Sequence, residues 1–125
     1  TTKSVKLFRS ALNGAAERPT PNNQPGTGIG LLALDGLTAT YIVSYQKLST
    51  TPNAFHLHGL GTAEQSVGVK FGLVPAGTLG TSGMFMGQAT VDQATADGIA
   101  QGLTYFNIHT PGQFAGGEIR GQVVP

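Results

Sequence analysis

The sequence contains no cysteine, and only 10% of its 125 residues are charged. The absence of cysteine excludes disulfide bridges, thiolate metal sites and a cysteine nucleophile. Seven Lys and Arg residues balance six Asp and Glu, so the formal net charge is +1, and no basic run is present to neutralise a phosphate backbone. We therefore expect no nucleic-acid partner.

Long hydrophobic runs are also missing. The longest markedly aliphatic stretch is 31–34 (LLAL), far shorter than the roughly 18 residues that a membrane helix needs. We expect no membrane span. The chain does not begin with methionine, which fits either a mature exported protein or a chain trimmed at its start, and the sequence does not separate the two.

Glycine and proline are abundant instead, with 19 and 7 residues, and hydrophobic residues make up 39% of the chain. That hydrophobic share is enough to bury a core, so the composition indicates a turn-rich folded protein rather than a disordered one. The length leaves room for one domain, and we predict a single domain over 1–125.

Hydrophobic residues alternate with polar ones, as in strands with one buried face. The clearest case is 37–45 (LTATYIVSY), which an Asp35-Gly36 link joins to 28–34 (GIGLLAL) in the pattern of a β-hairpin. Long loops are expected at 18–28, which holds three prolines, and at 49–53 and 110–117. Further strands are predicted near 4–12, 54–60, 67–74, 79–86, 103–109 and 117–124.

Only one segment, 91–101 (VDQATADGIAQ), indicates a helix, with Asp92 as its N-cap and Gly102 at its end. About eight short strands and one short helix predict an all-β fold, an antiparallel Greek-key sandwich or barrel.

All three histidines of the protein lie in two of the predicted strands. His56 and His58 share one strand face while Phe55 and Leu57 point the other way, and His109 lies on the face opposite Ile108. If the two strands are neighbours, three imidazoles converge on the outer side of the sheet, a geometry suited to copper or zinc. The alternative stays open, because three histidines are an ordinary number and surface strands often carry them.

The last strand has a polar face of its own. Glu118, Arg120 and Gln122 alternate with apolar residues, and a hairpin with 103–109 would place Arg120 or Glu118 beside His109. The alternative is a strand face covered only by solvent. Met84 and Met86 could offer thioethers to Cu(I), but their spacing around Phe85 favours a packing role.

Four segments, in order, resemble the motifs of the CHRD (chordin-type) domain family. They are 12–17 (LNGAAE), 55–59 (FHLHG), 102–110 (GLTYFNIHT) and 117–122 (GEIRGQ), and together they extend over nearly the whole chain. Members of this family are typically exported, so the resemblance implies export to the periplasm, the cell surface or the medium.

The CHRD pattern is similar, more distantly, to copper-zinc superoxide dismutase, a Greek-key β-sandwich or barrel. This similarity implies that His56, His58 and His109 are copper ligands and that Arg120 attracts an anionic substrate. The chain has no fourth histidine, no zinc cluster and no cysteine pair, so the site implied is mononuclear.

We therefore expect an exported copper-binding protein that is redox-active on superoxide or another small oxygen species, or that stores or transfers copper. Zinc is the competing metal. The alternative is a non-catalytic extracellular interaction module, for which Phe114 is the only isolated aromatic residue in an expected loop. The sequence does not predict an oligomeric state.

Overall fold

The alternating segments of the sequence form strands in a computed structural model, which describes residues 5–73 and 79–125. In chain order the elements are β1 (Val5–Asn13), a 3₁₀ turn (Gly14–Ala16), β2 (Thr27–Asp35), β3 (Thr38–Gln46), β4 (Ala54–Gly59), β5 (Val69–Gly72), β6 (Gly83–Thr90), α1 (Gln93–Ala100), β7 (Thr104–His109), a second 3₁₀ turn (Gly112–Phe114) and β8 (Ile119–Val123).

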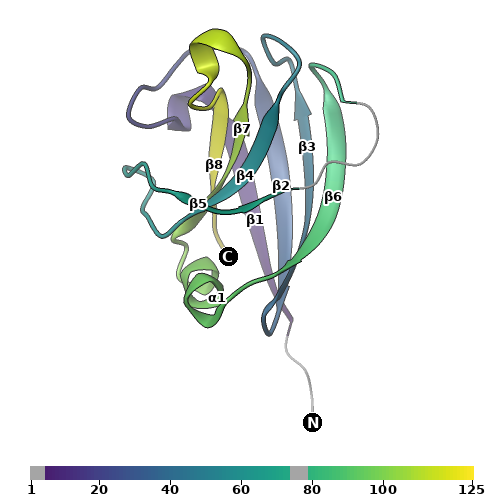
Figure 1. Ribbon diagram of the computed structural model, residues 1–125, viewed down its shortest axis with the longest axis vertical. Coiled ribbons are helices and arrows are strands. Elements are labelled where there is room, and N and C mark those ends of the chain that lie inside the picture. The colour runs from purple at the N-terminus through teal and green to yellow at the C-terminus, as the bar shows by residue number, and fades with distance from the viewer. Residues whose placement is uncertain (1–4, 74–78) are drawn as a thin grey trace.

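The eight strands form one antiparallel sheet that curls into a nearly closed barrel (Figure 1). Their order in the sheet is β5-β4-β7-β8-β1-β2-β3-β6. Three neighbouring pairs, β3–β6, β4–β7 and β8–β1, are not consecutive in the chain, as in Greek-key rather than up-and-down connections. The structure thus confirms the predicted all-β fold with one short helix.

The side chains that point into the barrel form a continuous apolar core. Phe55 of β4 and Phe85 of β6 meet edge-to-face across it, with ring centroids 4.4 Å apart. Ile99 of α1 is fully buried where the helix covers one end of the barrel (Figure 1). Gly30 is needed where it stands, because a Cβ atom there would lie 2.7 Å from the ring of Phe106.

The turn between β2 and β3 differs from the prediction by one residue. Asp35 pairs with Thr38 in the ladder, so the turn residues are Gly36 and Leu37 rather than Asp35 and Gly36. Gly36 has φ +62°, and among the described residues Lys47 is the only non-glycine with positive φ. Positive φ at the first turn residue alone fits a type II′ turn, which favours glycine at that position. Leu37 therefore leaves the strand and is exposed.

The strand predicted over 79–86 begins later, at Gly83. The preceding residues bond to other parts of the chain: the Leu48 N–H donates to the Thr81 carbonyl at 3.0 Å, and the Tyr45 hydroxyl donates to the Gly80 carbonyl at 3.0 Å. These bonds hold the segment as a loop. The strand predicted over 67–74 is confirmed only at 69–72, and residue 74 lies outside the described residues.

The predicted helix is confirmed as α1. The Asp92 side chain accepts from the Thr95 N–H at 2.8 Å, and Gly102 follows with φ +75°, as expected for an N-cap and a glycine stop. No helix in the described part of the chain is long and apolar enough to cross a membrane. The loops predicted at 18–28 and 49–53 are present, although β2 already begins at Thr27, and the loop at 110–117 contains the second 3₁₀ turn.

Candidate metal centre

The pairing of β4 with β7 brings the three histidines together. In that ladder Ala54 lies opposite His109, and His58 lies opposite Tyr105, so all three imidazoles stand on the same side of the sheet. One ring nitrogen from each histidine lies within 4.8 Å of the others. The His56 and His109 ring centroids are 4.7 Å apart, and His58 lies 5.5 Å from His56 and 5.9 Å from His109.

Backbone carbonyls hold two of the rings in place. The Nδ1 atom of His58 lies 2.8 Å from the carbonyl oxygen of Val67, and the Nδ1 atom of His109 lies 2.9 Å from that of Ala115. A carbonyl only accepts, so each Nδ1 carries a proton and donates it. In a neutral imidazole the other nitrogen, Nε2, then has a free lone pair. This pattern of a backbone-anchored imidazole is the one that metal-binding histidines use.

The third ring completes the cluster. The Nδ1 atom of His56 lies 3.0 Å from Nε2 of His109, so in the absence of a metal it donates to that lone pair. Two imidazole nitrogens bound at about 2.0 Å to one tetrahedral ion are separated by about 3.3 Å. The separation of these two atoms is therefore close to that of a pair of metal ligands.

His58 provides the test of whether a cation fits. Its Nε2 atom is buried and has no hydrogen-bond partner in the described part of the chain. A buried acceptor without a partner costs about 1–3 kcal/mol, which a bound cation would offset. The donor set fits a metal with an affinity for imidazole.

Two of the histidines are biased toward the neutral form that a metal needs. Burial lowers the pKa of His56 and of His58, and the neighbouring His109 lowers both further. Nearby Arg120 also contributes to the lowered pKa of His58, against a raising effect of the Val67 carbonyl. The lone pairs are therefore available at neutral pH.

Arg120 is separated from the histidine cluster by the ring of Tyr105 and does not lie beside His109. Its Cζ atom is 3.4 Å from the centroid of the Tyr105 ring, and the guanidinium donates to the Thr62 carbonyl at 3.0 Å. His58 stacks on the same tyrosine ring at 4.8 Å with an interplanar angle of 5°. The ring lies between the two, because both cannot occupy one face at these distances. Arg120 is only 2% exposed, so its guanidinium does not face solvent.

Glu118 is not joined to His109 either. Its side chain is fully buried, and its carboxylate accepts hydrogen bonds from the Ser49 backbone and hydroxyl and from the Thr110 hydroxyl. The expectation that this carboxylate lies beside the histidine is therefore wrong. The reason is that loop residues 49 and 110 supply donors at the end of the barrel.

The histidine-bearing face is more enclosed than a solvated strand face. Every residue of β7 is buried, on both sides of the sheet, and His58 and His109 are each only 9% exposed. The segment 60–68 covers one side, where the Val67 backbone bonds to the Tyr105 hydroxyl. His56 is the half-buried member, and a hollow of about 440 Å³ opens beside it.

Sequence reasoning missed Glu17 as a functional group. It is 4% exposed, and its Oε2 atom accepts from the Asn107 side chain at 2.7 Å. Burial raises its pKa to about 7, against the lowering effects of Asn107 and Arg120. The available signal was its position in the 12–17 motif, together with Asn107 between two core residues of a strand.

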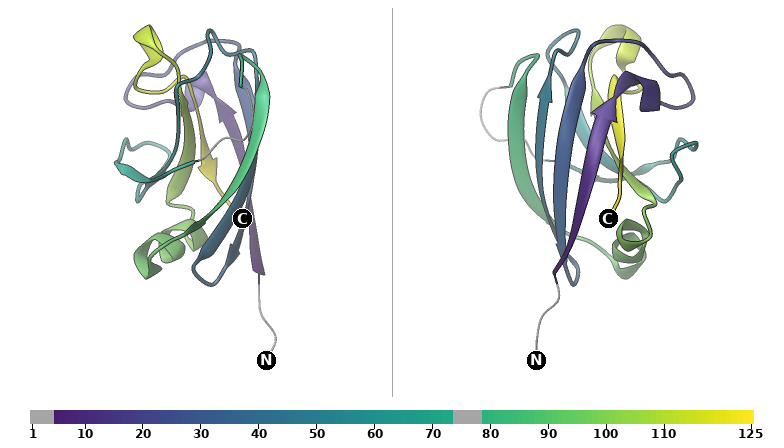
Figure 2. Two further views of the ribbon diagram at one scale, coloured as in Figure 1. Left: turned by 45° about the vertical axis from the view of Figure 1, so that its right-hand side comes forward. Right: turned by 180° about the vertical axis from the view of Figure 1, so that it is seen from behind.

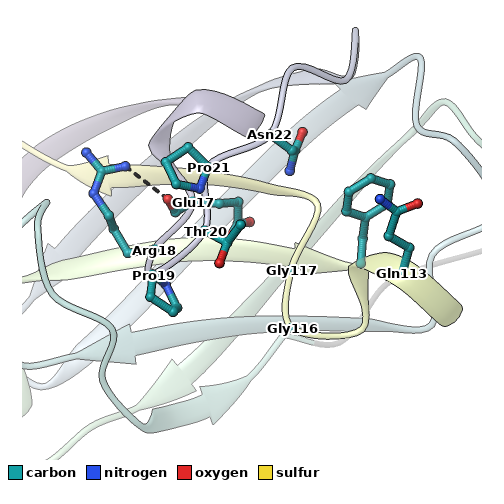
Figure 3. Close-up of a pocket in the computed structure, with 10 residues that line it drawn as sticks. Glu17, Arg18, Pro19, Thr20, Pro21, Asn22, Gln113, Gly116 and Gly117 are labelled. Atoms are coloured by element: carbon teal, nitrogen blue, oxygen red, sulfur yellow. Dashed lines mark hydrogen bonds between the residues drawn. The ribbon is translucent and has the colours of Figure 1, made fainter.

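A hollow of about 350 Å³ lies next to Glu17, between the proline-rich loop and the loop that follows β7 (Figure 3). Arg18 donates to the backbone carbonyl of Glu17 at 2.9 Å at its rim. Gln113 and Gly117 border the opposite side, and no histidine lines this hollow. It is therefore separate from the three-histidine cluster.

Comparison with known proteins gives one match. The family model described as CHRD domain matches residues 8–123. No curated protein and no solved structure matches the chain. CHRD domains occur in extracellular proteins.

Proposed function

Because the chain belongs to the CHRD domain family, we propose that it is an exported protein that binds one copper ion through His56, His58 and His109. The observation that carries the proposal is the buried, unpartnered Nε2 atom of His58, which belongs to a group of three imidazoles whose ligand nitrogens lie within 4.8 Å of one another. The family supports an extracellular setting, and the geometry supports a cation.

The ligand atoms follow from the hydrogen bonds. His58 and His109 offer Nε2, because each donates its Nδ1 proton to a backbone carbonyl. His56 offers Nδ1, which faces His109, and its proton moves to Nε2 when a metal binds. The half-buried position of His56 leaves that Nε2–H near solvent. Two rings are thus fixed in advance and one adapts.

Copper is the metal that the donor set favours. Imidazole suits both copper and zinc, and divalent copper binds a given nitrogen site more tightly than divalent zinc does. Zinc remains the competitor, since it accepts three imidazoles and a water. The sequence has three histidines and no cysteine, so the proposed site holds one ion.

Bound copper would supply one-electron redox chemistry toward superoxide or another small oxygen species. In that role His58 and His109 would hold their lone pairs fixed, and the half-buried His56, which lines an open hollow, would be the ligand nearest to solvent. Because the Arg120 guanidinium is buried against the Tyr105 ring, its positive charge would act on the site from behind that ring and not by direct contact with a small molecule. Storage or transfer of copper needs the same three ligands but does not require a small oxygen species to reach the metal.

A titration of metal-free protein with Cu(II) and Zn(II) against a competing chelator tests the proposal. We expect one ion per chain, tighter binding of copper, and a loss of affinity of about 100-fold in His109→Ala, because the two β4 ligands alone leave the site incomplete. Gln46→Ala, an exposed change on β3, is the control and should bind like the wild type. Equal affinity of the wild type and His109→Ala would refute the site.

Superoxide decay in a stopped-flow instrument separates the two roles. Copper-loaded protein that accelerates decay beyond the metal-free protein supports the redox role. Decay at the metal-free rate leaves storage or transfer as the role of the bound copper.

A second candidate function, that of an interaction module, is favoured by one observation, the apolar outer face of the sheet that is described next.

A further inference from the structure

The outer face of β1, β2, β3 and β6 is apolar at its centre. These strands lie side by side across the back of the molecule (Figure 2, right). Their register places Leu31, Ile42 and Met86 in one cross-strand row, and Ile29 and Met84 in the next. We call this surface the apolar face; its apolar members are Val5, Leu7, Ala11, Ile29, Leu31, Ala33, Ile42, Met84 and Met86.

Seven of these nine side chains are exposed, and Ala33 and Ile42 are half-buried. Leu7 is 73% exposed and Ile29 67%, and Met84 and Met86 are 54% and 55% exposed. The expected packing role of the two methionines is therefore wrong: Phe85 between them enters the core, while the methionines point outward. Exposed apolar side chains gathered over four neighbouring strands form the kind of patch that marks an interaction site on a soluble protein.

We propose that the apolar face is the interface of a symmetric dimer, with a second copy of this chain as the occupant. A standard interface buries about 800 Å² on each partner, and homodimer interfaces are more apolar than other surfaces. A smaller ligand would leave much of this surface in water.

The surface is also suited to bind a copy of itself. A hollow of about 360 Å³, lined by Leu7, Leu31 and Met86 among others, lies in this face, and the exposed side chain of Ile29 lies in the next cross-strand row. In a two-fold arrangement the same patch contacts itself, so one copy can insert its protruding side chains into the hollow of the other. Arg9 and Asp35 are the two charged residues on this side of β1, β2, β3 and β6, and their opposite signs allow them to pair between copies.

The proposed dimer does not depend on the metal. The histidines lie on β4 and β7, on the other half of the curled sheet (Figures 1 and 2). Two copies joined through the apolar face would leave both histidine clusters accessible. Failure of one proposal would therefore leave the other standing.

Sedimentation velocity on metal-free protein between about 1 and 100 µM tests the dimer. We expect the wild type to be dimeric at the upper end, and Leu31→Lys and Met86→Lys each to raise the dissociation constant about 100-fold by burying an unpaired charge. Val69→Lys on β5 is the matched control, since Val69 is also exposed, at 51%, but lies outside the apolar face. It should remain dimeric.

A wild type that stays monomeric at every concentration would overturn the proposal, as would a dimer that survives both face substitutions. Amide chemical shifts of the wild type on dilution give a readout that needs no variant. Shifts confined to β1, β2, β3 and β6 support the interface, and shifts confined to β4, β5 and β7 contradict it.

Discussion

Glu17 is a carboxyl group that is only 4% exposed and accepts a hydrogen bond from Asn107, with the charge of Arg120 nearby. Its pKa is raised from 4.5 to about 7, so the fold favours the protonated form. The stability that this preference contributes is fully present below pH 4.5 and is lost as the pH rises through about 7. At about 1.4 kcal/mol per pKa unit, the difference between 4.5 and about 7 corresponds to a loss of about 3–4 kcal/mol.

We predict that Glu17→Gln removes this loss, because glutamine resembles the protonated acid. The variant should match the wild type at pH 4 and exceed its unfolding free energy by up to about 3–4 kcal/mol at pH 8.5. Urea unfolding across this range is the measurement. Burial also lowers the pKa of His56 and His58, which costs stability below about pH 6.5, but both proteins share that cost. A difference that does not vary with pH would contradict the prediction.

For Arg120, the sequence predicts the face of the sheet on which the side chain lies, but it does not predict what surrounds the side chain there. Alternation along the last strand places it on the outer side of the sheet together with the histidines. Alternation does not reveal that the segment 60–68 folds over that side, or that Tyr105 lies between Arg120 and His58. The role inferred from the resemblance, attraction of an anion, remains a prediction.

We expect Arg120→Ala to lower the unfolding free energy by about 2–3 kcal/mol, since it removes a cation over an aromatic ring and the donor to Thr62. Arg120→Lys should recover only part of this, because an ammonium group lacks the planar fork. Chemical denaturation of both variants measures the effect. A loss below about 0.5 kcal/mol in Arg120→Ala, the range of ordinary surface changes, would show that the contact is not structural.

At the scale of elements, the segment 60–68 connects β4 to β5 and helps to orient the site. Val67 accepts from His58 through its carbonyl, and its N–H and carbonyl both bond to the Tyr105 hydroxyl. Arg18 adds an exposed ion pair to Glu64 at 3.2 Å. One backbone residue, Val67, thus links the segment to both the histidine and the tyrosine.

Tyr105→Phe should loosen this link. We predict that hydrogen exchange at the Val67 amide rises about tenfold, because its bond to the hydroxyl is lost, and that copper affinity falls several-fold as His58 is less firmly oriented. Exchange measured by NMR and the chelator titration give the two readouts. Tyr45→Phe, which loses a hydroxyl bond to Gly80 instead, is the control and should change neither. Unchanged Val67 exchange in Tyr105→Phe would refute the link.

The two halves of the barrel also depend on close approach at Gly30. We predict that Gly30→Ala lowers the unfolding free energy by about 1–3 kcal/mol, because the new methyl group overlaps the Phe106 ring. Gly72→Ala is the matched control, since a Cβ atom there meets nothing within 4 Å. Thermal unfolding of both variants should place only the first well below the wild type. Equal melting temperatures would contradict the packing.

Across the whole molecule, the sequence predicts where the strands lie in the chain better than it predicts which strands pair in the sheet. Period-two alternation locates β1, β3 and β7 to within about two residues, because one face of each strand meets the core. It fails where hydrogen bonds to distant residues decide, as at Gly80 and Thr81 before β6. The β4–β7 pairing that assembles the histidines is likewise non-local, and periodicity within a strand carries no information on its partner.

The apolar face is a second feature that periodicity within single strands does not predict. Alternation in β2 and β6 is weak, since residues such as Leu31 and Met86 are apolar but point outward. Its position as an isolated aromatic residue in an expected loop made Phe114 the candidate contact residue, yet it is half-buried beside the hollow near Glu17. Only the assembled sheet reveals that the outward apolar residues of four strands lie together.

X-ray absorption at the copper edge of protein loaded with one equivalent of copper examines the proposed centre directly. We predict three imidazole nitrogens at about 2.0 Å, and two in His109→Ala, whose protein must first be shown to be folded. A first shell of oxygen atoms, or the same number of imidazoles in the wild type and in His109→Ala, would contradict a centre built from His56, His58 and His109.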